Sequence, residues 1–302
     1  FAERAAPRPS HVTAAPRPLR SAAVIGGGVR GAGLSSALRS AGLSVVLVAD
    51  DDAAVLRGPQ TGGPLAGAMA ELIGDADLVI VAAEGVLATP AVLGRLGGMC
   101  RADAVLAVPT GAGDPHRTAE PVPTSARVLG LNLFGPTAGV ALLEIVPTAA
   151  TAPETLATGF ALARALGRIP VQTGIGDGSI GHRLRRRTRA AAEDLIRQGL
   201  AAATVDAAMR AYGFALGPFE AWDGSDPVHV GAMPGQGTPG RADLSDADIA
   251  ARLTAAMAEE GRALLDEGIA LRSSDIDLVA VHGHGYPRWR GGPMFEAGRQ
   301  VP

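Results

Sequence analysis

Short apolar runs alternate with stretches of helical spacing in the first part of the chain. The runs predict strands at 21–25, 44–48, 76–82, 104–108, 128–133 and 140–146. The stretches between them predict helices near 64–73, 86–98 and 153–167. Such alternation is typical of a doubly wound, mostly parallel sheet with helices on both faces. From residue 178 onward the pattern is helical only, with helices predicted at 179–199, 204–212 and 245–267. We therefore expect an α/β domain followed by an all-α domain.

A glycine-rich motif stands between the first predicted strand and the helix that follows it. Gly26, Gly28 and Gly31 form a GxGxxG pattern, which in this context binds the pyrophosphate of a dinucleotide. Gly26 permits a tight turn, Gly28 lets the backbone approach the phosphates, and Gly31 allows close packing of helix on strand. The helix N-terminus offers backbone N–H groups to the phosphates. The motif predicts a Rossmann domain, and a glycine-rich turn without a ligand is the alternative.

The other predicted cofactor contacts lie beside this motif and after the second predicted strand. Asp50 follows Gly31 by nineteen positions (50 − 31) and can bond the ribose hydroxyls. Asp51 and Asp52 come next, and three acids together would repel a 2′-phosphate, so we expect NAD rather than NADP. A solvated acidic loop is the alternative for Asp51 and Asp52. The complete predicted cofactor-binding set is Gly26, Gly28, Val29, Arg30, Gly31, Asp50 and Ala82.

Composition narrows the classes of function. The formal charge of −3 gives no reason to expect a nucleic acid partner or a membrane surface. No apolar run approaches the roughly 20 residues that span a bilayer. A single cysteine, Cys100, excludes an intramolecular disulfide and fits a reducing compartment, so we expect a cytoplasmic protein. Lysine is absent and Asn132 is the only asparagine.

Several motifs resemble those of NAD-dependent L-3-hydroxyacyl-CoA dehydrogenases, and most closely the dehydrogenase half of the multifunctional fatty-acid β-oxidation proteins. The resemblance covers about 19–302, with specific matches at 26–31, 77–80, 129–144, 177–183, 217–220 and 285–295. It implies oxidation of an L-3-hydroxyacyl-CoA to a 3-oxoacyl-CoA with NAD as the hydride acceptor. An acyl-CoA substrate, an upstream enoyl-CoA hydratase module, a thiolase partner and a dimer are further expectations.

The resemblance also divides the chain into segments. The glycine- and proline-rich stretch around 224–243 indicates a linker between two helical repeats. The expected segments are a linker remnant (1–18), an NAD-binding domain (19–177), a first helical repeat (178–230), a linker (231–243) and a truncated second helical repeat (244–302).

The family's active-site positions are occupied unusually in this sequence. Glu144 stands in the position of the family's orienting Glu, but Asn132 replaces the family's acid/base His. Gly111 replaces a Ser, and His182 replaces an Asn. An Asn amide neither takes up nor releases a proton at pH 7, whereas general acid/base help contributes about 10²–10⁴ in rate. The sequence therefore predicts impaired catalysis.

Three alternatives for the function follow from these replacements. His182 could be a relocated base, although a single His in an arginine-rich helix start is more often a surface residue. A catalytically impaired homologue could instead serve as a scaffold for a hydratase or thiolase module. A decaying gene fragment that no longer folds is the third alternative, and the intact apolar pattern argues against it.

Missing and misleading features complete the picture. The segment 51–75 is too short for the helical excursion that contacts coenzyme A in the family. The family's Glu and Lys near the nicotinamide fall at Val81 and near Ala88. His282 and His284 lie in a glycine-rich turn without a nearby partner for a metal, so we expect no metal site. The arginines between 183 and 189 could meet a phosphate, but a solvated helix explains them better.

Overall fold

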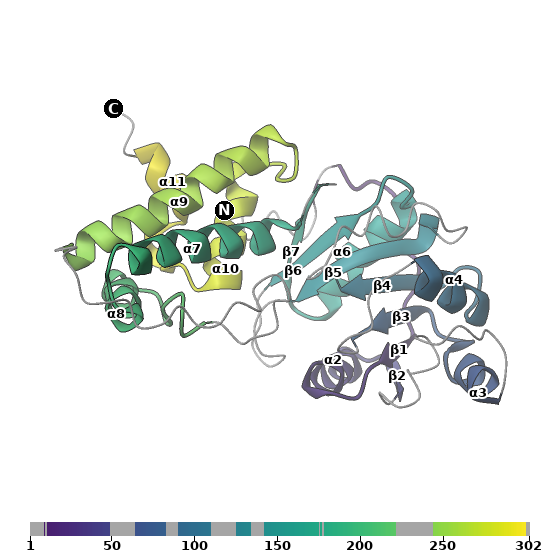
Figure 1. Ribbon diagram of the computed structural model, residues 1–302. Coiled ribbons are helices and arrows are strands. Elements are labelled where there is room, and N and C mark those ends of the chain that lie inside the picture. Colours follow the sequence, from purple (N-terminus) through teal and green to yellow (C-terminus); the bar gives the residue numbers. More distant parts are fainter. Residues whose placement is uncertain are drawn as a thin grey trace. The chain divides into compact units, whose positions relative to one another are not determined.

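A computed structural model describes residues 9, 11–48, 64–82, 90–109, 125–133, 142–174, 176, 178–221 and 244–299. The chain divides into two compact units, Phe1–Asp177 and Gly178–Pro302 (Figure 1). Asp50, Gly111 and Ala88 lie outside the described residues, as do the predicted linker at 231–243 and the start of the 86–98 helix.

The first unit is built on a single sheet. Its strands are β1 (Ser21–Ile25), β2 (Ser44–Val48), β3 (Leu78–Val81), β4 (Val105–Pro109), β5 (Val128–Leu133), β6 (Leu142–Pro147) and β7 (Ile169–Gln172). They lie in the order β2-β1-β3-β4-β5-β6-β7. All neighbouring pairs are parallel except β5 and β6, which are antiparallel. The predicted doubly wound, mostly parallel sheet is therefore confirmed.

Helices cover both faces of this sheet. They are α2 (Val29–Ser40), α3 (Pro64–Ile73), α4 (Pro90–Met99) and α6 (Pro153–Ala165), with a short 3₁₀ helix, η2 (Ser125–Arg127). The central strands read as nearly continuous aliphatic runs because parallel strands between two helical layers are buried on both sides. In β3, all four residues of the run Leu-Val-Ile-Val are buried.

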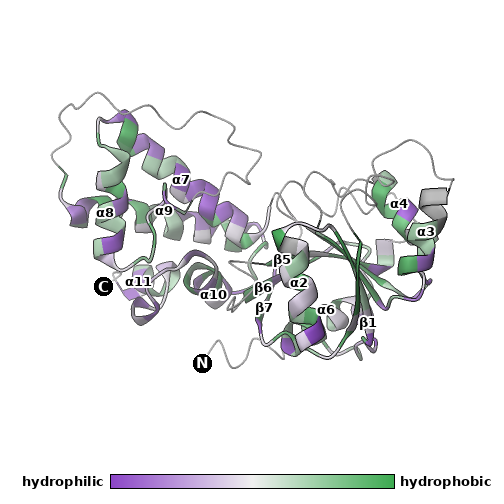
Figure 2. Ribbon diagram, turned by 90° about the horizontal axis from the view of Figure 1, so that it is seen from below, coloured by the Kyte–Doolittle hydropathy of each residue, from purple (hydrophilic) through white to green (hydrophobic). Residues whose placement is uncertain are grey.

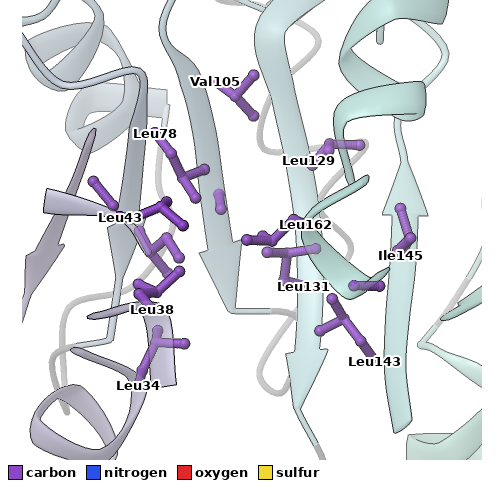
Figure 3. Close-up of a cluster of buried hydrophobic side chains, with 14 of the residues drawn as sticks. Leu34, Leu38, Leu43, Leu78, Val105, Leu129, Leu131, Leu143, Ile145 and Leu162 are labelled. Carbon is purple, nitrogen blue, oxygen red and sulfur yellow. The ribbon is translucent and has the colours of Figure 1, made fainter. Parts of the chain in front are cut away.

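Each face has its own hydrophobic core. On one face, Met69 and Ile73 of α3 and Leu93 of α4 pack against alternate strand residues such as Ile25. On the other face, the core residues come from α2, α6 and the intervening strands, and they include Leu34, Leu38, Leu78, Val105, Leu129, Leu131, Ile145 and Leu162. Figure 3 shows Leu162 of α6 beside Leu131 of β5, and Leu38 near Leu43. These two layers fix the sheet that carries the candidate site.

The second unit is helical and centres on its longest helix. Its helices are α7 (Ile180–Arg197), α8 (Ala202–Tyr212), α9 (Asp246–Asp266), α10 (Ser273–His284) and α11 (Pro293–Arg299), with a 3₁₀ helix, η4 (Arg288–Arg290). α9 packs against α7, α8, α10 and α11. Ser245 and Asp248 form a reciprocal capping box that begins α9. Figure 2 shows the strongly hydrophilic colouring of α7, in keeping with its arginines.

The same local structure occurs twice in the second unit. Asp206 on α8 accepts a hydrogen bond of 2.9 Å from the backbone N–H of Phe219, in a Gly-Pro-Phe-Glu turn. Asp277 on α10 accepts one of 2.8 Å from the backbone N–H of Met294, in a Gly-Pro-Met-Phe-Glu turn. In each case the glycine of the turn lies against the aspartate, with no room for a Cβ atom. The second helical part therefore repeats a structure of the first.

The differences from the predicted elements are local. β5 and α3 have the predicted bounds, whereas β3 and β6 are shorter than predicted. β7, α10 and α11 were not predicted. β7 is short and contains Pro170, and Pro is usually a sign against a strand. Pro170 is tolerated because β7 is an edge strand of the sheet.

Candidate functional site

The glycine-rich loop turns tightly at the carboxyl end of β1. Gly26 has φ of 126°, a value that residues with a side chain rarely adopt, and its N–H donates to the Val48 carbonyl at 2.9 Å. The N–H of Ala82, at the end of β3, donates to the Ile25 carbonyl at 2.7 Å. The loop thus lies at the ends of β1, β2 and β3, where β2 and β3 flank β1. Ligands of doubly wound sheets bind at such a switch point.

The other two glycines have the roles that the motif predicts. A Cβ atom on Gly31 would lie 1.7 Å from the Gly26 carbonyl oxygen, so only glycine allows α2 to start this close to the loop. Gly28 is the N-cap residue of α2, and a Cβ atom there would meet nothing within 4 Å. Val29, the first residue of α2, is 90% exposed. Open space beside Gly28 and a helix N-terminus without an acidic side chain in its first turn fit the pyrophosphate of a dinucleotide.

The structure places the predicted cofactor residues unevenly. It brings Gly26, Gly28, Gly31 and Ala82 together around the loop. The backbone of Arg30 belongs to the first turn of α2, and its side chain lies outside the described residues. The ribose contact predicted for Asp50 stays a prediction.

Asn132 and Glu144 face each other across the antiparallel pair β5 and β6. They are direct cross-strand partners, and Asn132 Nδ2 donates to Glu144 Oε2 at 2.9 Å. Glu144 is fully buried and Asn132 is half-buried. The two residues were predicted to belong to one site, and the sheet brings them into contact. The pair can hold a hydrogen bond, but its amide does not supply a proton carrier at neutral pH.

Thr173, a residue that sequence reasoning missed, also contacts Glu144. Its hydroxyl donates to Glu144 Oε1 at 3.1 Å, and it is fully buried at the end of β7. The two carboxyl oxygens of Glu144 therefore each accept a hydrogen bond, one from each neighbouring strand. The signal that could have found Thr173 was the β-branched run at 169–173, which the proline obscured.

His182 belongs to the second unit, in the first turn of α7. Its backbone N–H donates to the side chain of Ser179, the N-cap residue, at 3.3 Å. A role for its imidazole as a relocated base stays a prediction. Gly111 lies outside the described residues, so its place in the site also stays a prediction.

The arginines of α7 mostly pair with carboxylates of the helical unit. Arg183 is almost fully buried and bonds Glu260 and Glu267 of α9. Hydrogen bonds from Glu267 raise the pKa of Arg183 further above its ordinary value. Arg187 pairs with Glu259 of α9 at 2.9 Å. These contacts explain the basic run as helix packing.

Two further observations concern metals and membranes. Within the described ranges, no group of three or more His, Cys, Asp or Glu side chains could hold a metal ion. Desolvation, together with the charge of Arg185, lowers the pKa of His284 to about 4, so its imidazole is neutral at pH 7. None of the helices that the structure describes combines the length and apolarity needed to cross a bilayer.

Comparison with known proteins agrees with this site. Residues 63–177 match the family model for the NAD binding domain of 3-hydroxyacyl-CoA dehydrogenase. The peroxisomal bifunctional enzyme of Cavia porcellus is 26% identical over 397 aligned residues, which include 98% of this chain and 54% of that protein. The chain spans about half the length of the curated relatives it matches.

Solved structures resemble the same fold. The 3-hydroxybutyryl-CoA dehydrogenase from Escherichia coli K12 has a TM-score of 0.55 and 28% identity, covering 67% of this chain and 48% of that one. The dehydrogenase part of multifunctional enzyme 1 from C. elegans has a TM-score of 0.60 over 92% of this chain and 81% of that one. Its identity is 16%, so this likeness shows the fold alone.

The resemblance that the motifs predicted is confirmed, and so is a Rossmann domain of the NAD-binding kind. The matched model begins after the glycine-rich loop, which the geometry of Gly26 and Gly31 supports separately. This chain belongs to the 3-hydroxyacyl-CoA dehydrogenase family.

Proposed function

We propose that this chain binds NAD and a 3-hydroxyacyl-CoA of fatty-acid β-oxidation, and that its proton-transfer step is impaired. The single observation that carries the proposal is the hydrogen bond from Asn132 to Glu144. It keeps a hydrogen-bond donor to Glu144 at the family's acid/base position, but the donor is an amide. NAD, when bound, accepts the hydride that leaves C3 of the hydroxyacyl group.

The residues around the loop support the cofactor half of this proposal. Gly26 and Gly31 build the tight turn, and the open space at Gly28 admits a pyrophosphate against the first turn of α2. We expect NADH to bind more tightly than NADPH, because Asp50, Asp51 and Asp52 repel a 2′-phosphate.

The residues at the sheet support the impaired half. Oxidation of the substrate hydroxyl releases a proton, and a neighbouring side chain must take it up. The imidazole that does this in the family is replaced by the amide of Asn132, which does not titrate at neutral pH. The expected loss is about 10²–10⁴ in rate, the usual contribution of general acid/base help.

A scaffold role is the second candidate. It is favoured by the same amide, because a protein that retains the fold and the Glu144 contact but lacks a base can still assemble with other modules. Under this alternative, an enoyl-CoA hydratase module, a thiolase partner and a dimer are the proposed contacts. We also propose a cytoplasmic location, which the single cysteine supports.

The test measures binding and turnover separately. Fluorescence titrations with NADH and NADPH report the cofactor, and reduction of acetoacetyl-CoA by NADH reports catalysis. We expect NADH binding with very low turnover, a gain in turnover for Asn132→His, and a further gain on adding Gly111→Ser. Asn132→Ala is the matched control, since it also removes the amide but supplies no base, and it should gain nothing.

Other outcomes would decide against parts of the proposal. A wild-type rate typical of an active dehydrogenase would contradict the impaired step, and its loss in His182→Ala would identify His182 as the base. NADH binding without any gain in Asn132→His would mean that the substrate is not held in place, because a base acts only on a positioned substrate. Binding of neither nucleotide would favour the scaffold.

A further inference from the structure

Glu144 is held from both sides by donors on its two neighbouring strands. Asn132 of β5 donates to Oε2 at 2.9 Å, and Thr173 at the end of β7 donates to Oε1 at 3.1 Å. Glu144 and Thr173 are both fully buried. A carboxyl group with a donor on each oxygen is fixed in the plane of its two hydrogen bonds, because rotation about its terminal bond would break both.

Thr173 is itself fixed by the sheet. Its backbone N–H donates to the Ile145 carbonyl at 2.9 Å, which continues the parallel pairing of β6 and β7. In that pairing Glu144 lies beside Val171, so Thr173 follows the partner of Glu144 by two positions. Residues two apart on a strand point to the same side of the sheet. The Thr173 hydroxyl therefore reaches Glu144 from a rigid position.

We propose that Thr173 is a positioning residue for this site: it fixes the carboxyl group of Glu144, which in turn orients the side chain at position 132. The inference rests on the proposed function for its meaning in catalysis, but its geometry stands without it. Orienting side chains are held by hydrogen bonds from neighbouring residues, and loss of such support weakens a site although no reacting atom is touched.

A purely structural role is the alternative for Thr173. In that case the hydroxyl only satisfies a buried oxygen of Glu144, and its removal changes stability without changing the orientation of Asn132. A readout at Asn132 itself therefore separates the two roles.

The composition of the chain makes that readout simple. Asn132 is the only asparagine, so the whole protein labelled with [¹⁵N]asparagine gives one side-chain amide group in an NMR spectrum. In the unaltered chain we expect one of its two N–H protons to lie downfield and to exchange slowly with solvent, since it donates to buried Glu144. Thr173→Val keeps the shape and removes the hydroxyl. It should move this signal and speed the exchange roughly tenfold, as expected when a hydrogen bond to a charged group is weakened by about 1.5 kcal/mol.

Matched variants complete the experiment. Thr173→Ser retains the hydroxyl and should restore the Asn132 signal. Thr155→Val removes another fully buried hydroxyl of the same unit, which donates to the Ala126 carbonyl at 3.0 Å, and should leave the Asn132 signal unchanged. If Thr173→Val does not fold, Thr173→Ala provides the same test without a branched side chain. An unchanged Asn132 signal in a folded Thr173→Val or Thr173→Ala protein would overturn the proposal. Loss of the signal in a folded Thr173→Ser protein would overturn it as well.

Turnover in the Asn132→His background links the inference to catalysis. There we expect Thr173→Val to lower kcat several-fold with little change in KM, and Thr173→Ser to recover it. Equal kcat in the presence and absence of the hydroxyl would overturn the catalytic part of the inference. An inactive Asn132→His protein counts against the proposed function alone, because the NMR readout does not depend on activity.

Discussion

Gly31 packs so closely on Gly26 that a Cβ atom at position 31 would lie 1.7 Å from the Gly26 carbonyl oxygen. A backbone atom cannot move aside as the end of a side chain can, so any side chain here displaces the loop or the start of α2. The contact joins the loop to its helix and sets the cradle for the pyrophosphate.

We therefore expect Gly31→Ala to lower the free energy of unfolding by at least about 1–3 kcal/mol, the usual cost of overpacking, and to abolish NADH binding. Gly28→Ala is the matched variant. Its Cβ meets open space and its φ of −64° suits any residue, so stability should hold while NADH affinity falls. Thermal melting and NADH titration measure both. A Gly31→Ala protein with the melting temperature of the unaltered chain would contradict this account of the loop.

The buried Arg183 gives a second prediction, for the helical unit. Its side chain is 9% exposed and bonds two carboxylates of α9. Arg183→Met leaves Glu260, itself mostly buried, without this partner, and we expect a loss of about 3–5 kcal/mol in the free energy of unfolding. Arg187→Met is the control: its pair with Glu259 is exposed on both sides and should contribute less than about 1 kcal/mol. Urea denaturation measures the two losses, and equal losses would show that burial is not what matters.

Asp277 predicts an unusual dependence of stability on pH. Desolvation raises its pKa from 3.8 to about 6, although the backbone N–H groups of Met294 and Phe295 work in the opposite direction. Because the folded protein then holds its proton more tightly than the unfolded chain, this group stabilises the fold as pH falls from about 6 towards 3.8. Above pH 6 its buried charge lowers stability.

The substitution that isolates this effect is Asp277→Asn, which keeps the oxygen that accepts from Met294. We expect the difference in unfolding free energy between the variant and the unaltered chain to favour the variant at pH 7 and to shrink at pH 5. Other acids contribute equally to both proteins and cancel in the difference. Parallel curves of stability against pH for the two proteins would refute the raised pKa.

Ser35 of α2 predicts a stabilising substitution. Its hydroxyl is fully buried, and it has no hydrogen-bond partner among the described residues. Ser35→Ala removes the unsatisfied group and improves helix propensity, so we expect a gain of about 1–2 kcal/mol in the free energy of unfolding. Ser36→Ala, on the exposed side of the same helix, gains the propensity alone. A Ser35→Ala gain no larger than that of Ser36→Ala would indicate that the hydroxyl is satisfied in solution.

The sequence by itself determined the features that depend on neighbouring residues. The order of strand, glycine-rich loop, helix and strand from 21 to 48 follows from local apolar pattern and from glycine positions, and the structure has it as predicted. The bounds of β5 were also predicted, because its run of apolar residues ends where polar and turn residues begin. The Asn132–Glu144 pair was predicted only through the family resemblance, which carries three-dimensional information that no local pattern holds.

Only the tertiary structure decided which distant residues meet. Thr173 reaches Glu144 across 29 positions, and Arg183 reaches Glu260 across 77. The first contact needs the sheet order that places β7 beside β6 and a register that points Thr173 and Glu144 the same way. A pattern of apolar and polar positions fixes which side of a strand is buried, but it is the same for every strand that could lie alongside. Pairing is settled by packing of the whole sheet and its helices, so the partners of buried polar groups emerge only when the chain is folded.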